Sequence, residues 1–198
     1  MTTQVTGSGV NFNGSTSGTI TLTQPAIAGT NTVTLPAETG TLRSTVSSGT
    51  VLQVVNYQTG AVATGTTLMP FDDTIPQITE GNEYMTLAIT PKSATSKLII
   101  QVVWCGTSSF IDYLTTALFQ DAAPDALATV AQVNGTGSWM LANVLVHVMT
   151  SATTSSTTFK IRTGGNSGSG TTTFNGSASA RRFGGSLASS ITITEVVP

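Results

Sequence analysis

The stretch YMTLAITPKSATSKLIIQVVW, residues 84–104, shows the pattern that decides the fold. Its first part, 84–91, and its last part, 96–104, are short apolar runs rich in the β-branched and aromatic residues that strands favour. The segment PKSATS lies between them, and Pro91 opens it as a turn. The stretch therefore predicts two strands joined by a turn.

Short runs of the same kind continue in both directions, with turn signals such as DAAP and NGTGS between them. No long stretch follows the 3.6-residue period of an amphipathic helix. This spacing predicts an all-β fold, an antiparallel β-sandwich of the jelly-roll type. The other expected strands span residues 51–58, 113–120, 126–133, 139–150, 157–164, 171–175 and 189–197.

One segment leaves an alternative open. TTALFQDAAPDALATVAQ, residues 115–132, is the single candidate helix in the chain. Pro124 lies in its middle, where it would break a helix, and its β-branched residues favour strands. We therefore expect strand, turn and strand here.

The composition changes near residue 50. Residues 1–50 contain two charged side chains, Glu38 and Arg43, among many Thr, Ser and Gly. Alternating residues over 18–25 and 30–42 predict two half-buried strands. An isolated hairpin is marginally stable in water, so it needs the body or copies of itself. We expect 1–50 to be a β-hairpin arm for virion attachment and trimerisation, and 51–198 to be a β-sandwich head domain. The candidate core of the arm consists of Ile20, Leu22, Val33, Leu35 and Leu42.

The overall composition excludes several functional classes. Only 8% of the residues are charged, whereas 39 are Thr and 21 are Ser. This charge content is too low for a typical helix-rich cytosolic enzyme, and the apolar content is too high for ordinary disorder. Seven Lys and Arg against nine Asp and Glu leave no excess of cations for phosphates, so we expect no nucleic-acid partner.

Targeting and redox features are few. Cys105 is the single cysteine, so an intrachain disulfide is excluded. The first residues have neither the basic nor the apolar region of a secretory signal, and the longest apolar runs are too short to span a membrane. We expect a soluble protein without membrane insertion that is made in a cytoplasm.

The sequence offers little chemistry for catalysis. His147 is the single histidine, which excludes a paired-histidine mechanism and a histidine-rich metal site. It lies in the middle of a predicted strand, on the face opposite Val144, Val146 and Val148, and we interpret it as an ordinary strand residue. Cys105 is interpreted as a small buried hydrophobic residue. We expect no enzyme activity, no catalytic residue, no resident metal and no cofactor.

Two other features have bland interpretations. The acidic residues form two clusters, at 72–83 and 112–125, which we interpret as solvated loop acids. A structural cation is the open alternative, and paired carboxylates of a glycosidase are a weaker one. The Gly-rich stretch 164–177 lacks the features of a phosphate loop or a dinucleotide fingerprint, so we expect a flexible loop. The clustered acids are Asp72, Asp73, Glu80, Glu83, Asp112, Asp121 and Asp125.

Two parts of the chain resemble tailed-bacteriophage fibre proteins. The segment VNFNGSTSGTITLTQPAIAGTNTVTLPAETGTL, residues 10–42, resembles the short Thr/Gly-rich module of these and other phage structural proteins. The body is similar to their C-terminal β-sandwich in VLQVVNYQTG, LAITPKSATSKLIIQV, TTFKIRTGG and SSITITEV, which occur in the same order. The resemblance implies a tail fibre that attaches to the virion through its N-terminal arm and faces the host with its sandwich, usually as a parallel homotrimer.

The resemblance also implies the partners. These are two further copies of the chain, another virion structural protein bound by the arm, and a host cell-surface glycan or envelope protein. The location is the virion, on the tail or the capsid surface, after assembly in the host cytoplasm. Because the chain has one module and one sandwich, a capsid decoration or head-fibre protein without receptor binding is the alternative. A glycan-degrading tailspike and a free carbohydrate-binding module are disfavoured.

We expect host contact on the loops of the head, because loops on a rigid sandwich vary without disturbing its strands. The candidate loops are 106–113, 134–139 and 164–183. The alternative is that the aromatic residues lie in the core and the arginine pair lies at a subunit interface. The candidate receptor-binding residues are Phe110, Asp112, Tyr113, Trp139, Arg181 and Arg182.

Overall fold

A computed structural model of the chain describes residues 10–13, 19–22, 48–135, 139–166, 168 and 170–198. The chain divides into two units, Met1–Ser44 and Thr45–Pro198. The second unit contains the body of the protein, and the first contains a short hairpin.

The hairpin of the first unit consists of β1 (Val10–Asn13) and β2 (Thr19–Leu22), which pair antiparallel. The strand expected at 18–25 is therefore confirmed in its central part. Its partner is β1, whereas we expected 30–42, a segment that lies outside the described residues together with Val33, Leu35 and Leu42. The backbone register places Ile20 opposite Phe12 and Leu22 opposite Val10.

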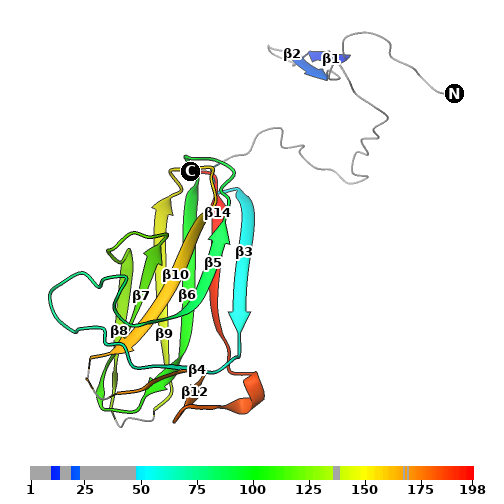
Figure 1. Cartoon of the computed structure of the whole chain (residues 1–198). Coiled ribbons are helices and arrows are strands. Elements are labelled where there is room, and N and C mark those ends of the chain that lie inside the picture. Colours follow the sequence, from blue (N-terminus) through cyan, green and yellow to red (C-terminus); the bar gives the residue numbers. More distant parts are fainter. Residues whose placement is uncertain (1–9, 14–18, 23–47, 136–138, 167, 169) are drawn as a thin grey trace. The chain divides into compact units, whose positions relative to one another are not determined.

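Two large antiparallel sheets contain the eight long strands of the body (Figure 1). One sheet has the order β5-β10-β7-β8, and the other contains β3-β14-β6-β9, because β6 pairs with β14 along one edge and with β9 along the other. The long strands are β3 (Val51–Thr59), β5 (Asn82–Ile89), β6 (Lys97–Ser108), β7 (Asp112–Gln120), β8 (Ala128–Asn134), β9 (Leu141–Thr150), β10 (Thr157–Gly165) and β14 (Ser189–Val196).

The long strands pair in a nested order along the chain. The first pairs with the last, β3 with β14, and the second with the seventh, β5 with β10. The third pairs with the sixth, β6 with β9, and the two central strands, β7 and β8, form a hairpin. A long nested hairpin folded over itself into two sheets is a jelly roll, which confirms the predicted antiparallel β-sandwich.

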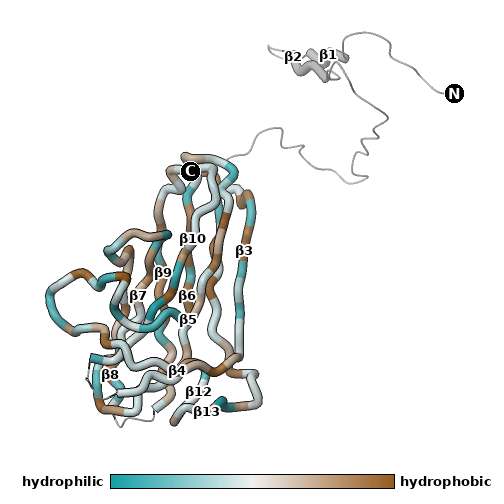
Figure 2. Tube along the Cα trace, in the orientation of Figure 1, coloured by the Kyte–Doolittle hydropathy of each residue, from teal (hydrophilic) through white to brown (hydrophobic). Residues whose placement is uncertain are grey.

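The core lies between the two sheets. On β6 the side chains of Leu98, Ile100, Val102 and Trp104 alternate inward and are completely buried. They pack against the inward side chains of the other sheet, among them Leu118 of β7. The hydrophobic stretches follow the strands of both sheets (Figure 2). The period of two read from the sequence is thus the period of burial.

The outer face of β9 is apolar and exposed. Val144, Val146 and Val148 are 53–57% exposed, whereas His147 lies on the inward side and is partly buried, which confirms that it lies on the opposite face from the valines. Val148 pairs with Ile99 of β6, and both belong to a row that crosses the sheet to Val54 of β3. Among the described strands, β9 pairs with β6 alone, so this face ends at a free strand edge.

One buried carboxylate interrupts the apolar inner face of β14. Glu195 has no solvent exposure, and its two oxygens accept hydrogen bonds from the backbone N–H groups of Lys92 and Ser93, the hydroxyl of Ser96 and the amide of Gln53. Burial by itself raises the pKa of this carboxyl, but these hydrogen bonds outweigh burial and hold the pKa below its usual range. Glu195 therefore closes the turn that joins β5 to β6.

The alternative left open at 115–132 is decided by β7 and β8, which are strands joined by a turn, as expected.

The expected flexible loop at 164–177 is wrong over much of its length. β10 runs on to Gly165, and short strands follow it. Of these, β11 confirms the strand expected at 171–175, and it pairs with the end of β6 and with β4. The pairing joins distant parts of the chain, so the local Gly-rich composition does not reveal the other short strands. The short elements are β4 (Ala63–Gly65), β11 (Thr172–Phe174), β12 (Gly176–Ser177), β13 (Ala180–Arg181) and the 3-10 helix η1 (Phe183–Gly185).

Within the described part of the chain, no helix is long and apolar enough to cross a membrane.

Candidate functional site

Residues 66–81, here called the covering loop, lie on the outer face of the sheet β5-β10-β7-β8 (the teal coil in Figure 1). Met69 of the loop is completely buried against Ala117 and Phe119 of β7. Ile78 of the same loop packs on this second, smaller core. The covering loop is therefore packed onto the sheet.

Backbone contacts hold the first part of the covering loop close to β10. The N–H of Met69 donates to the carbonyl of Gly165 at 3.0 Å. A Cβ atom on Gly164 would lie 2.6 Å from the carbonyl oxygen of Thr67 and 3.0 Å from the Met69 nitrogen. Only a residue without a side chain leaves room for this approach.

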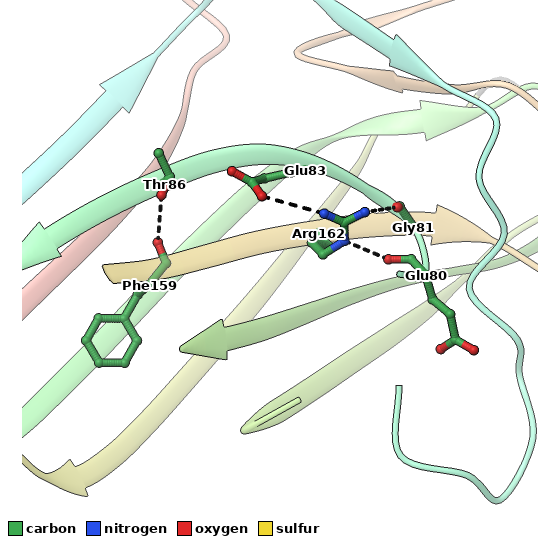
Figure 3. Close-up of polar contacts among 6 residues, drawn as sticks. All are labelled: Glu80, Gly81, Glu83, Thr86, Phe159 and Arg162. Atoms are coloured by element: carbon green, nitrogen blue, oxygen red, sulfur yellow. Dashed lines mark hydrogen bonds and ion pairs between the residues drawn. The ribbon is translucent and has the colours of Figure 1, made fainter. Parts of the chain in front are cut away.

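Arg162 of β10 fastens the other end of the covering loop (Figure 3). Its guanidinium donates to the carbonyl of Glu80 at 2.9 Å and to the carbonyl of Gly81 at 2.7 Å, and it lies 3.5 Å from the carboxylate of Glu83. These three contacts of one planar guanidinium fix the direction in which the loop enters β5.

A pocket of about 230 Å³ lies between the covering loop and the outer face of β7 and β8. One wall of the pocket comes from the covering loop, and the other comes from the sheet. The residues that line it are Pro70, Phe71, Asp72, Thr74 and Pro76 of the loop, Thr115 of β7, and Thr129 and Ala131 of β8.

An aromatic pair borders this pocket. The rings of Phe71 and Tyr113 are stacked, with centroids 3.8 Å apart and planes within 3° of parallel. Both stay open to solvent, since Phe71 is 54% exposed and Tyr113 is 38% exposed. The stack restricts the ring of Phe71 at the pocket wall, because a rotation of that ring would break the contact. The predicted candidate Tyr113 is thus at the surface, and its partner Phe71 was missed.

Thr115 gives the pocket a polar floor. It is 3% exposed, and its hydroxyl has no hydrogen-bond partner. On the other side of β7, the hydroxyl of Thr116 is bonded to Thr163 and to Asn143. A buried hydroxyl without a partner costs about 1–3 kcal/mol, so an unsatisfied one at a pocket wall is a feature that a bound molecule would use.

Asp72 makes the pocket negative. One of its carboxylate oxygens accepts hydrogen bonds from the N–H and the hydroxyl of Thr74, at 2.8 and 2.6 Å. These two bonds hold the pKa of Asp72 below its usual range, so the group is ionised at neutral pH. The lining residues include no Lys or Arg, and the other carboxylate oxygen accepts no hydrogen bond from the described residues.

The remaining predicted contact residues are spread over the body. Phe110 and Trp139 are exposed, and so are Arg181 and Arg182, in and next to β13. Asp112 is 7% exposed and accepts a hydrogen bond from the Ser108 hydroxyl, so the surface position expected of it is wrong. It is buried because β6 and β7 run further than expected, which leaves only 109–111 of the expected 106–113 loop.

Within the described residues, no hydrogen bond or ring contact joins Tyr113 to the exposed candidates Phe110, Trp139, Arg181 and Arg182. Sequence reasoning missed both Phe71 and Thr115. Phe71 had a detectable signal, an aromatic residue between a proline and two acids in a polar loop, whereas Thr115 is one threonine among many.

Other candidate chemistry is limited in the described part of the chain. No group of three or more His, Cys, Asp or Glu side chains there could hold a metal ion. Cys105 is buried, and burial raises the pKa of its thiol, which disfavours the nucleophilic thiolate.

No family model and no curated protein matches this chain. Solved structures of infectious bursal disease virus particles are similar to this chain at low identity and low TM-score. The infectious bursal disease virus VP2 subviral particle is 15% identical over 85% of this chain, with a TM-score of 0.33. The T=1 particles derived from that virus are 14% identical over 90% of the chain, with a TM-score of 0.33. The Gx strain of the virus gives 16% identity over 90%, with a TM-score of 0.32. The chain spans only 44–45% of the length of these proteins.

Proposed function

We propose that this protein is a structural protein of a bacteriophage virion, a tail fibre that attaches through its N-terminal arm and binds the host surface through its β-sandwich. The resemblance of residues 10–42 and of the body to phage fibre proteins supports this role. The observation that carries the binding part is the exposed Phe71–Tyr113 stack beside a pocket with an unsatisfied hydroxyl. An exposed aromatic stack beside a pocket is a feature of a binding site, which a capsid decoration protein without receptor binding would not need.

The proposal includes assembly as a homotrimer. The outer face of β9 supports self-association, because three half-exposed valines follow one another along this strand. The residues beside them on the two neighbouring strands carry no charge: these are Ile99, Gln101 and Val103 of β6, and Ser190, Thr192 and Thr194 of β14. An apolar face almost without charge matches another copy of itself better than it matches an ionic partner. Covering each exposed valine contributes about 1 kcal/mol, half the value for a fully buried aliphatic side chain.

Light scattering tests the assembly. The full-length protein should give about three times its monomer mass of 20.2 kDa. Val146→Lys should shift it toward smaller species, whereas Val133→Lys, an equally exposed valine on β8, should not. A monomeric wild type would refute the trimer, and an unchanged Val146→Lys variant would leave the arm as the assembly element.

Adsorption tests the host-binding role. Purified full-length protein should compete with virions for host cells, and Phe71→Ala should lose this competition. Phe183→Ala, which removes another exposed phenylalanine, in η1, serves as the control. Equal competition by wild type and both variants would refute the role of Phe71 in host binding. No competition by the wild type would remove the receptor role and favour the capsid-decoration alternative, and imaging of labelled protein on virions would then show its position. We propose no enzyme activity for the chain.

A further inference from the structure

The pocket under the covering loop has the size of a single sugar ring. Pockets for drug-sized ligands occupy roughly 300–1,000 Å³. At about 230 Å³ this one is smaller, and Phe71 in its wall is 54% exposed. A monosaccharide at the end of a longer glycan fits such a site, since the rest of the chain can leave past this exposed ring.

The aromatic wall of the pocket suits one face of a pyranose. The C–H bonds on one face of the sugar ring carry a small positive charge, which is attracted to the negative face of an aromatic ring. Phe71 supplies that ring, and its stack on Tyr113 holds it in place without a ligand. A ring that is already fixed loses little conformational freedom on binding.

The polar atoms of the pocket suit sugar hydroxyls. The buried Thr115 hydroxyl can donate one hydrogen bond and accept another, and it has no protein partner. The free oxygen of the Asp72 carboxylate can accept from a second hydroxyl, and a hydrogen bond to a charged acceptor is among the stronger ones. A ligand hydroxyl at Thr115 would relieve a cost that the empty protein carries.

Charge decides which sugars are excluded. The Asp72 carboxylate lines the pocket and the neighbouring Asp73 adds a second acid, while no cation lines the pocket. An acidic sugar or a phosphate would bring a like charge next to this carboxylate, and like charges repel.

We infer that the pocket lined by Phe71, Asp72 and Thr115 binds one neutral pyranose of a host glycan and rejects acidic sugars. This inference rests on the proposed host-binding role for its biological meaning, but the binding itself is measurable without virions or cells.

Saturation-transfer NMR on the full-length protein tests the inference. The probes are the neutral monosaccharides glucose, galactose, mannose and N-acetylglucosamine, and glucuronic acid as the acidic counterpart of glucose. At least one neutral sugar should bind with a Kd in the millimolar range, about −4 kcal/mol, and glucuronic acid should bind at least tenfold more weakly than glucose. The absence of binding by every neutral sugar would overturn the inference, and so would equal binding of the acid.

Thr115→Val is the decisive variant, because it replaces a hydroxyl by a methyl group of the same shape. We expect binding to weaken about tenfold, while the midpoint of urea unfolding stays unchanged or rises, since an unsatisfied buried hydroxyl is removed. Thr116→Val is the matched control. It removes a bonded hydroxyl on the inner face, so it should lower stability and leave sugar binding unchanged. Unchanged binding in Thr115→Val would refute the role of the pocket floor.

Asp72→Asn tests the charge. It should narrow the difference between glucose and glucuronic acid, and an unchanged difference would contradict the proposed exclusion. Sugar binding that persists while the protein fails to compete for host cells would refute the host-binding role alone. Loss of adsorption in Phe71→Ala without any sugar binding by the wild type would refute this inference alone.

Discussion

Replacing Glu195 by Gln should destabilise the body at neutral pH and remove part of its acid sensitivity. The carboxylate is completely buried and accepts hydrogen bonds at 2.6 Å from the Gln53 amide and at 2.8 Å from the Lys92 N–H. A glutamine keeps one acceptor oxygen but places an NH₂ group where the other oxygen was. That group faces at least one donor, so one hydrogen bond to a charged acceptor is lost.

The magnitude follows from this count. A hydrogen bond to a charged group contributes about 1.5–3 kcal/mol, and the bonds that remain lose their charge assistance. Gln53 keeps a second acceptor, the carbonyl of Thr90 at 2.8 Å, which limits the loss on its side. We therefore expect Glu195→Gln to lower the free energy of unfolding by about 2–3 kcal/mol at pH 7.

The pH dependence has a defined sign. The folded protein holds the pKa of Glu195 below its usual value, so the ionised carboxylate contributes stability above the unfolded pKa of about 4.3. This contribution is lost as the pH falls through the folded pKa. The difference between wild type and Glu195→Gln should therefore be largest at neutral pH and shrink below about pH 4.3.

Equilibrium urea unfolding measures both effects at a fixed protein concentration. It is followed by tryptophan fluorescence, in which the buried Trp104 should change on unfolding more than the exposed Trp139. Glu83→Gln is the control, because its partly exposed carboxylate makes one ion pair at 3.5 Å and should cost less than about 1 kcal/mol. Equal stability of Glu195→Gln and wild type at pH 7 would refute the reasoning. A difference that stays constant down to pH 3 would refute the pKa direction.

Two further predictions concern the covering loop and the free thiol. Gly164→Ala should lower the free energy of unfolding by about 1–3 kcal/mol, because its Cβ would press on the loop backbone. It should also make residues 66–81 more sensitive to limited proteolysis. Gly168→Ala, whose Cβ would meet nothing within 4 Å, should change neither the stability nor the proteolysis. Cys105 should react with a thiol reagent at pH 8 far more slowly in the native protein than in urea, because burial excludes the reagent and raises the pKa of the thiol. Equal rates in both conditions would show that the end of β6 opens freely.

The candidate site was only partly predictable from the sequence. Tyr113 was predicted as a surface aromatic, but the stack that gives it a role pairs it with Phe71 from a loop that we interpreted by its acids. Thr115 and Thr116 are adjacent threonines, and only their opposite directions on β7 make one a pocket floor and the other a bonded core residue. We expected Asp112 at the surface, but it is buried. The expectation was wrong because the ends of strands depend on pairing with distant strands, which no local sequence pattern shows.

The sequence by itself determined where the strands of the body lie and that they form an antiparallel sandwich. Alternation, turn residues and β-branched content act within a few residues of each other, so stretches such as 84–104 specify their own local structure. Only the tertiary structure decided which strands pair, which face of each is buried and what covers the sheet. The apolar Val144, Val146 and Val148 point outward while the polar Asn143 is buried, because Asn143 finds acceptors on β7 that lie far from it in sequence. Burial depends on partners brought together by the nested pairing, and a local pattern contains no information about them.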